Sequence, residues 1–204
     1  MGSIAVDIHD LQDDHQSTHM VNFIRNHQTT LTLSKNPDFQ ETPLDSASIP
    51  ESLRSSNLIT GALAGPQKLL MAPFAFRNHS DNIFVMFMYL GSGICGHPGI
   101  VHGGVLATLM DEGLARCCFP LLPNKVGVTA NLNIDYRAPA MADSYVVLWA
   151  QTTKVEGRKA WVKARIETLS VDEDSHGAKL LVEASALFIE PRLAETFDTP
   201  YKGV

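Results

Sequence analysis

One long apolar helix, entered directly from a glycine-rich turn after residue 95, limits the possible folds more than any other feature. The apolar pattern runs to about Phe119, where Pro120 ends the helix because proline cannot continue one. The helix itself is apolar on almost every side, through Val105, Leu106, Leu109, Met110, Leu114, Cys117 and Cys118. A helix of this kind is enclosed by protein rather than laid on a surface. The neighbouring segments must therefore wrap it.

Strand patterns precede and follow this helix. The six expected strands lie at 69–76, 83–90, 126–136, 145–152, 160–168 and 179–189. The clearest is 126–136, where apolar and polar residues alternate with a period of two. The turn Glu156-Gly157-Arg158 is expected to join two strands as a hairpin. Connections after the helix are too short for crossover helices, so these strands should be antiparallel. The sequence predicts an α+β fold in which a curved antiparallel sheet of about six strands wraps one long central helix.

The charge and composition of the sequence change near residue 58. Residues 1–57 carry eight acidic and three basic side chains, a net charge of −5, whereas the rest of the chain carries −1. We expect 1–57 to be an N-terminal extension that is partly helical, with a helix near 11–27, or partly disordered. A lid over the site is the alternative. Residues 58–191 should form the globular domain, and 192–204 a C-terminal tail.

Charge and composition exclude several classes of protein. The nearly neutral body has no basic field for nucleic acid, and no apolar run is long enough to span a bilayer. Three cysteines do not make a disulfide framework, which favours a reducing compartment. The acidic start argues against a mitochondrial transit peptide. We therefore expect a cytoplasmic protein.

The start of the helix predicts a chemical site. Free backbone N–H groups and a partial positive charge in the first turn can hold the oxygen of a polarised carbonyl. Gly103 and Gly104 have no side chains to block a substrate. Asp111 is an acid at a position where the helical pattern calls for an apolar residue. Together they indicate an oxyanion site with a base or nucleophile.

Three segments, 96–113, 127–136 and 154–159, resemble the hot-dog fold acyl-CoA thioesterases. The similarity is closest to the phenylacetyl-CoA-type branch and its eukaryotic acyl-CoA thioesterase relatives, and it covers about residues 58–191. It implies a hot-dog fold and a hydrolase of lipid or secondary metabolism that converts an acyl-CoA to the free acid and CoA. No cofactor is implied beyond the CoA of the substrate.

The resemblance also implies roles for individual residues. The backbone N–H of Gly103 would hold the thioester oxygen, and Asp111 would be the nucleophile or general base. Thr129 lies where the family often has a Ser or Thr that orients the attacking group or water.

Further residues would contact the substrate around this centre. His102 would flank the oxyanion site, and His97 is the candidate for a polar helper in the preceding loop. Gly104 is expected beside the bound CoA. Arg158 and Lys159, on the hairpin, would contact the CoA phosphates.

The spacing of Gly103 and Asp111 predicts a dimer. Eight residues along a helix rise roughly 12 Å, whereas a carbonyl held by one and attacked from the other needs them within about 6–7 Å. Gly103 of one subunit facing Asp111 of the other would satisfy both. We expect an isologous dimer, or a dimer of dimers, with two shared sites. Residues 126–136 would pair across the interface.

These residues also have structural interpretations. Asp111 could be a buried acid paired with Arg116 or capped by hydroxyls, and the two glycines could serve close packing. Thr129 could be an ordinary strand residue on a solvated face. Residues 158–159 could be a solvated hairpin tip.

Alternative functions stay open at this point. The acyl group could ride on a carrier protein or be a polyketide intermediate, or the chain could bind acyl-CoA without turnover. Hydratase chemistry needs a His/Asp or His/Glu pair near the β-carbon of the substrate, which His102 with Asp111 does not obviously supply. A metal site at His97 and His102 has no further cluster of ligands to support it.

Overall fold

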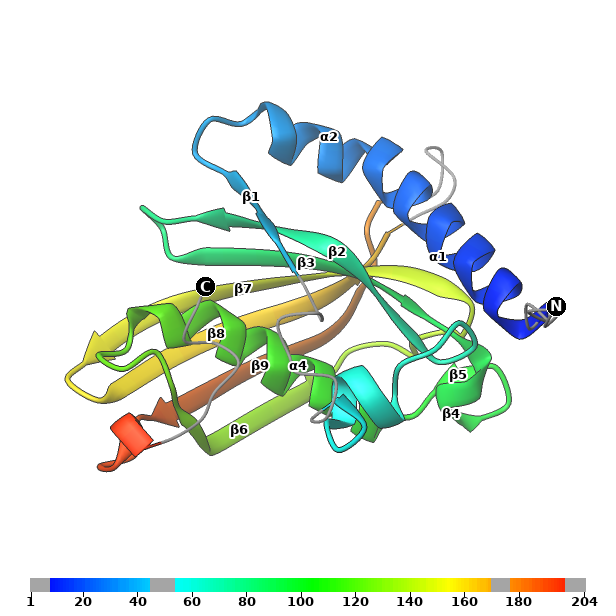
Figure 1. Ribbon diagram of the computed structural model, residues 1–204. Coiled ribbons are helices and arrows are strands. Elements are labelled where there is room, and N and C mark those ends of the chain that lie inside the picture. The colour runs from blue at the N-terminus through cyan, green and yellow to red at the C-terminus, as the bar shows by residue number, and fades with distance from the viewer. Residues whose placement is uncertain (1–7, 45–53, 170–176, 197–204) are drawn as a thin grey trace, which may run out of the picture.

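The computed structural model describes residues 8–44, 54–169 and 177–196. A curved sheet wraps the central helix α4 (Gly103–Cys118), and two further helices lie on the opposite face of the sheet (Figure 1). This is the α+β hot-dog arrangement expected from the sequence. From residue 197 onward, the predicted C-terminal tail lies outside the described residues. Within the described ranges, no helix is long and apolar enough to cross a membrane.

The sheet has seven strands in the order β1-β2-β3-β7-β8-β9-β6, and each pair of neighbours is antiparallel. Its strands are β1 (Gln40–Pro43), β2 (Leu69–Asn78), β3 (Ile83–Leu90), β6 (Val128–Tyr136), β7 (Ser144–Glu156), β8 (Lys159–Thr168) and β9 (Leu180–Ile189). The six predicted strands and their antiparallel pairing are confirmed. The count of six is one too low, because residues 40–43 of the N-terminal extension pair with β2.

Short elements complete the part of the chain that the structure describes. A two-stranded hairpin, β4 (Cys95–His97) with β5 (Ile100–Val101), leads directly into α4. The single-turn helices are η2 (Leu58–Ala62), η3 (Ser92–Ile94), η4 (Phe119–Leu121) and η5 (Ala194–Thr196). Gly157, with φ +56°, forms the predicted turn between β7 and β8.

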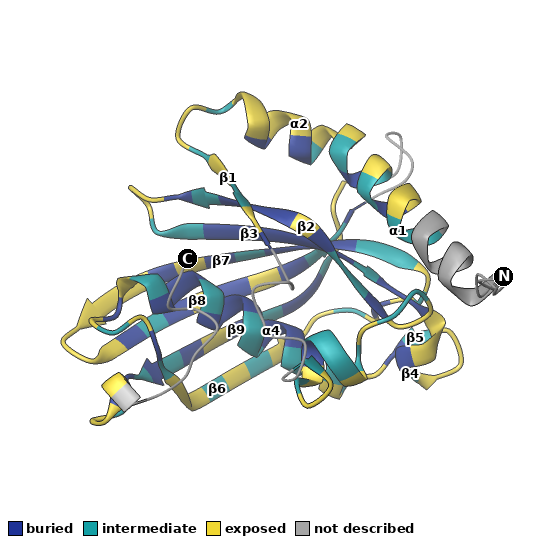
Figure 2. Ribbon diagram, in the orientation of Figure 1, coloured by how far each residue is buried: buried dark blue, intermediate teal, exposed yellow. Residues whose placement is uncertain are grey.

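Both faces of the sheet are covered, which explains the unbroken apolar run of β3. Phe84, Met86 and Met88 belong to the core around α4, whereas Val85 and Phe87 belong to a second core on the outer face. A strand buried on both faces needs apolar residues at every position rather than at alternate ones. Figure 2 shows the buried middle of the sheet and the contrasting exposure of β6 at its edge.

Helices α1 (Ile8–Asn26) and α2 (Gln28–Lys35) build the second core. Met20, Ile24 and Leu33 pack against the outer face of the sheet, and the ring of Phe23 stacks on that of Tyr145 at 4.1 Å. The helix expected near residues 11–27 is confirmed. Helices α1 and α2 of the extension cover the face of the sheet opposite α4 (Figure 1), whereas Leu44 belongs to the core around α4. The alternative of a lid over the site stays a prediction.

The edge strand β6 departs from the strict alternation predicted for residues 126–136. Its register against β9 shifts between Thr129 and Asn131, so one extra residue is accommodated there. A bulge of this kind reverses which side chains face the core. Thr129 before the bulge and Leu132 after it therefore both face α4, although one number is odd and the other even.

Candidate functional site

The first turn of α4 begins with a histidine cap. His102 has an extended backbone (φ −63°, ψ 131°), and its Nδ1 accepts the N–H of Gly104 at 2.9 Å. Since Nδ1 acts as the acceptor, the proton of the neutral ring is on Nε2. The carbonyl of His102 accepts the N–H of Val105 at 2.9 Å. Within the described part of the chain, the N–H of Gly103 has no hydrogen-bond partner and remains available to a ligand.

A glycine in the preceding hairpin makes room for this cap. A Cβ on Gly96 would lie only 2.9 Å from Cδ2 of His102, so the ring packs directly on the backbone of residue 96. His97 follows at the exposed end of β4, in the same hairpin that leads to the cap. The turn therefore brings His102 against Gly104, while His97 stays at the surface.

Tyr136, to which the sequence analysis assigned no role, contacts the same turn. Its hydroxyl donates a 2.9 Å hydrogen bond to the carbonyl of Gly103. Its ring lies beside the same glycine, since a Cβ there would meet Cε1 at 3.5 Å. The only sequence signal for this contact was a tyrosine at the end of a strand with alternating residues. The fold was needed to show that its hydroxyl reaches Gly103.

Asp111 lies in the middle of α4 and meets β6. The hydroxyl of Thr129 donates a 2.8 Å hydrogen bond to its Oδ1. Burial raises the pKa of the Asp111 carboxyl above its ordinary value, the hydrogen bond from Thr129 lowers it in part, and the neighbouring charge of Glu112 raises it. The carboxylate is half-buried beside a single hydroxyl donor, an environment that suits an acid–base or nucleophilic group.

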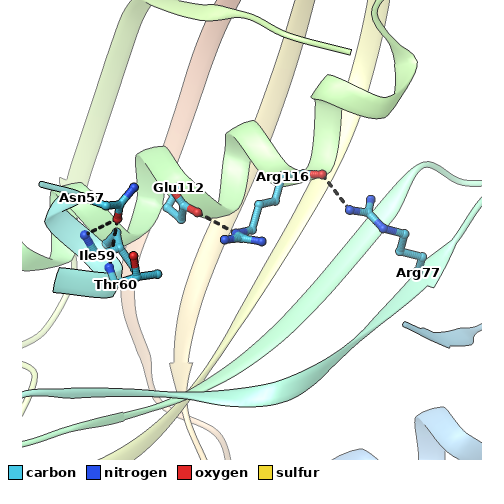
Figure 3. A network of polar contacts seen from close by, with 6 residues as sticks. All are labelled: Asn57, Ile59, Thr60, Arg77, Glu112 and Arg116. Atoms are coloured by element: carbon cyan, nitrogen blue, oxygen red, sulfur yellow. Dashed lines mark hydrogen bonds and ion pairs between the residues drawn. The ribbon is translucent and has the colours of Figure 1, made fainter. Parts of the chain in front are cut away.

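The next residues of the helix form a separate polar network on another side (Figure 3). Glu112 and Arg116 form an ion pair of 2.6 Å, and the backbone carbonyl of Arg116 accepts a 2.9 Å hydrogen bond from Arg77. Arg116 also borders a mostly apolar cavity of about 240 Å³ between η2 and β2. The Thr60 hydroxyl, on η2 beside this network, is buried without a hydrogen-bond partner among the described residues. The sequence analysis left two structural interpretations of Asp111, pairing with Arg116 or capping by hydroxyls. Its hydrogen bond with Thr129 corresponds to the second.

The remaining predicted residues lie apart from this turn within one chain. Arg158 and Lys159 are exposed at the turn between β7 and β8, at the other end of the sheet from the β4–β5 hairpin (Figure 1). The guanidinium of Arg158 donates a 2.7 Å hydrogen bond to the carbonyl of Glu190. Gly103 and Asp111 are likewise separated along α4 by two helical turns, a rise of about 12 Å. One chain thus joins Asp111 to Thr129 and Gly103 to Tyr136, but not the two pairs to each other.

Comparison with known proteins places this geometry in a family. Residues 98–173, which include α4 and the strands β6, β7 and β8, match the model of the thioesterase superfamily. A putative thioesterase from Ralstonia eutropha, described as a phenylacetic acid degradation-related protein, has a similar fold. Its TM-score is 0.50 at 18% identity, over 65% of this chain and 89% of that one.

Two relatives are similar in sequence. A Candida albicans protein named "Uncharacterized protein, mitochondrial" is 34% identical over 152 residues, which cover 74% of this chain and 68% of the relative. The rat acyl-coenzyme A thioesterase THEM4 is 39% identical over 115 residues, which cover 56% of this chain and 46% of the relative. The chain thus matches less than half the length of the rat enzyme.

The cytoplasmic location expected from the sequence is wrong in the light of the Candida relative, which is named as mitochondrial. The argument for the cytoplasm was the acidic charge of residues 1–57, and that charge tests only one class of targeting signal. By contrast, the expected family is confirmed by the matched model and by the relatives, and the expected fold by the similar structure. This chain, with its histidine-capped central helix inside a curved antiparallel sheet, belongs to the thioesterase superfamily.

Proposed function

We propose that the protein hydrolyses an acyl-CoA thioester to the free acid and CoA. One observation carries this proposal. The carboxylate of Asp111, on the central helix, is half-buried and accepts a hydrogen bond from the hydroxyl of Thr129 on β6. The unbonded N–H of Gly103 supports it by offering a donor for the thioester oxygen. The name of the rat relative, an acyl-coenzyme A thioesterase, agrees with this chemistry.

The residues fit the steps of hydrolysis. The ionised Asp111 accepts a proton from a water molecule, whose oxygen attacks the carbonyl carbon; alternatively, the carboxylate attacks directly and water hydrolyses the resulting anhydride. In either route the carbonyl oxygen becomes negative and accepts the N–H of Gly103. Collapse of the tetrahedral intermediate breaks the C–S bond. The thiolate of CoA leaves and takes up a proton, which is favourable because a thiol has a pKa of about 8.5.

We propose that each site uses two subunits. Gly103 and Asp111 are too far apart on one helix to act on one carbonyl, as the rise of about 12 Å requires. The edge strand β6 is the proposed surface for a partner, since seven of its nine residues are exposed and it carries both Thr129 and Tyr136. Pairing of two β6 edges in an antiparallel dimer would continue the sheet. Gly103 of one subunit would then face Asp111 of the other.

The CoA part of the substrate is assigned to the exposed β7–β8 turn. Arg158 and Lys159 would bind its phosphates from the partner subunit, and Gly104 would allow the pantetheine arm to approach the turn of the helix. No resident cofactor is needed for this reaction. The relative named as mitochondrial also leads us to propose a mitochondrial location, which imaging of a C-terminal fluorescent fusion would test.

A thiol-release assay tests the function. Purified protein is supplied with acyl-CoA substrates of increasing chain length and with matching carrier-protein thioesters, and free thiol is measured. Asp111→Asn should lower turnover by about 10² to 10⁴ with the fold intact. Asp38→Asn is the matched control, because Asp38 is an exposed acid between α2 and β1, at the opposite edge of the sheet from β6. Absence of thiol release by the unmodified protein, or full activity of Asp111→Asn, would contradict the proposal.

A further inference from the structure

We propose that Tyr136 is a positioning residue that fixes the direction of the oxyanion donor, the N–H of Gly103. This inference rests on the function proposed above and adds a residue to its site. Tyr136 comes from the edge strand β6, 33 residues away from the glycine whose carbonyl it contacts.

Two peptide groups meet at the Cα of Gly103, and both are held. The peptide between His102 and Gly103 carries the proposed donor, and its carbonyl accepts the N–H of Val105 at 2.9 Å. The peptide between Gly103 and Gly104 is held at both ends. Its carbonyl accepts the hydroxyl of Tyr136 at 2.9 Å, and its N–H is accepted by Nδ1 of His102 at 2.9 Å.

Such a double restraint has a physical purpose at this position. Two consecutive glycines leave space for a substrate, but they have the greatest backbone freedom of any residues. A donor that stabilises an oxyanion is effective only when its direction is set before the reaction. Because Tyr136 and His102 hold opposite ends of one peptide, the glycine turn keeps its open space and loses its freedom to rotate.

The restraint from Tyr136 should affect the reaction rather than the stability of the fold. The side chain of Tyr136 is 53% exposed, and a hydrogen bond at an exposed site contributes little to folding. The negative charge on the thioester oxygen develops fully only in the transition state. A less rigid donor should therefore lower kcat and leave KM almost unchanged.

The experiment compares Tyr136→Phe with Tyr89→Phe. Tyr89 makes a hydrogen bond of similar length, 2.8 Å, to Asp143 on the outer face of the sheet, where the proposed site has no residues. We expect Tyr136→Phe to lower kcat about tenfold, less than the loss of a donor itself, with KM and Tm near those of the unmodified protein. Tyr89→Phe should keep the full kcat.

A second measurement does not depend on turnover. Hydrogen exchange is followed in protein labelled with ¹⁵N-glycine, which gives signals from only 14 glycines. The N–H of Gly104 should exchange faster in Tyr136→Phe than in Tyr89→Phe. If the unmodified protein releases no thiol but this difference is found, the proposed function fails and the restraint stands. A kcat of Tyr136→Phe within twofold of normal, or equal exchange in the two variants, overturns the inference.

Discussion

The hydroxyl of Thr129 donates a hydrogen bond of 2.8 Å to Oδ1 of Asp111, and so joins the edge strand β6 to the central helix α4. The contact exists because the bulge after Thr129 turns this side chain toward the helix. It stabilises the ionised carboxylate against the effect of burial, which favours the protonated form. The strand proposed as the dimer interface therefore helps to keep the proposed catalytic carboxylate ionised.

Removal of the Thr129 hydroxyl should shift the pH dependence of hydrolysis. The hydrogen bond lowers the pKa of Asp111, so Thr129→Val should raise that pKa further. Since the ionised carboxylate is the active form, the acidic limb of kcat/KM against pH should move to higher pH in Thr129→Val. Thr129→Ser keeps a donor and should restore the original limb. Superimposable profiles for Thr129→Val and the unmodified protein would show that the hydroxyl does not act on the carboxyl.

Asp111→Asn should be at least as stable as the unmodified protein at neutral pH. Burial raises the pKa of Asp111 in the folded state, so folding favours the protonated carboxyl. The stability that this proton contributes is present below the unfolded pKa and is lost as pH rises through the folded pKa. The neutral amide avoids that loss. Thermal unfolding from pH 3 to pH 8 should give a gap in Tm that favours Asp111→Asn at pH 8 and closes at pH 3, and a gap of opposite sign would refute the stated cause.

Two inactive variants should complement each other if the site is shared between subunits. Gly103→Pro removes the proposed donor N–H at the first position of the helix, where proline is well tolerated and the extended backbone of His102 suits it. Mixed dimers of Gly103→Pro with Asp111→Asn would contain one intact site, made of Gly103 from one chain and Asp111 from the other. Co-refolding equal amounts should restore about a quarter of the normal rate. No recovery, with mixed dimers verified by mass spectrometry, would indicate that each chain works alone.

Lys159 should affect the binding of CoA but not the chemistry. Lys159→Ala should raise KM for acyl-CoA several-fold and leave kcat unchanged, since a phosphate contact is equal in ground and transition states. The same acyl group on N-acetylcysteamine, which has no phosphates, should show no change. Lys163→Ala provides a matched loss of an exposed lysine on the same strand β8. An equal rise in KM for both thioesters would rule out a role at the phosphates.

The sequence predicted the central helix and the strands well because each of these elements depends on a local pattern of residues. The helix from Gly103 to Cys118 follows from a glycine turn, an apolar surface and the proline after it. The strand at 83–90 was predicted from its continuous apolar residues, although the sequence did not show why every residue is apolar. Only the fold shows that α1 covers the outer face, so that β3 is buried on both sides.

The candidate site was predicted in part. Asp111 could be selected as an acid in an apolar pattern, and the amino end of the helix as a source of donors. The strict alternation of residues 126–136, by contrast, placed Thr129 on the side opposite Tyr136. The bulge overturns that placement, and nothing in the residue types of this strand marks its position. Tyr136 itself was missed because a tyrosine fits the alternation without any polar role.

What the sequence determined by itself is therefore the central helix, the antiparallel strands and the acid in the helix, because periodicity and helix termination are properties of adjacent residues. The tertiary structure decided which hydroxyl reaches Asp111 and which phenol reaches Gly103. Those contacts join residues 18 and 33 positions apart. They depend on strand register and on one bulge, which the packing of the sheet around the helix fixes as a whole.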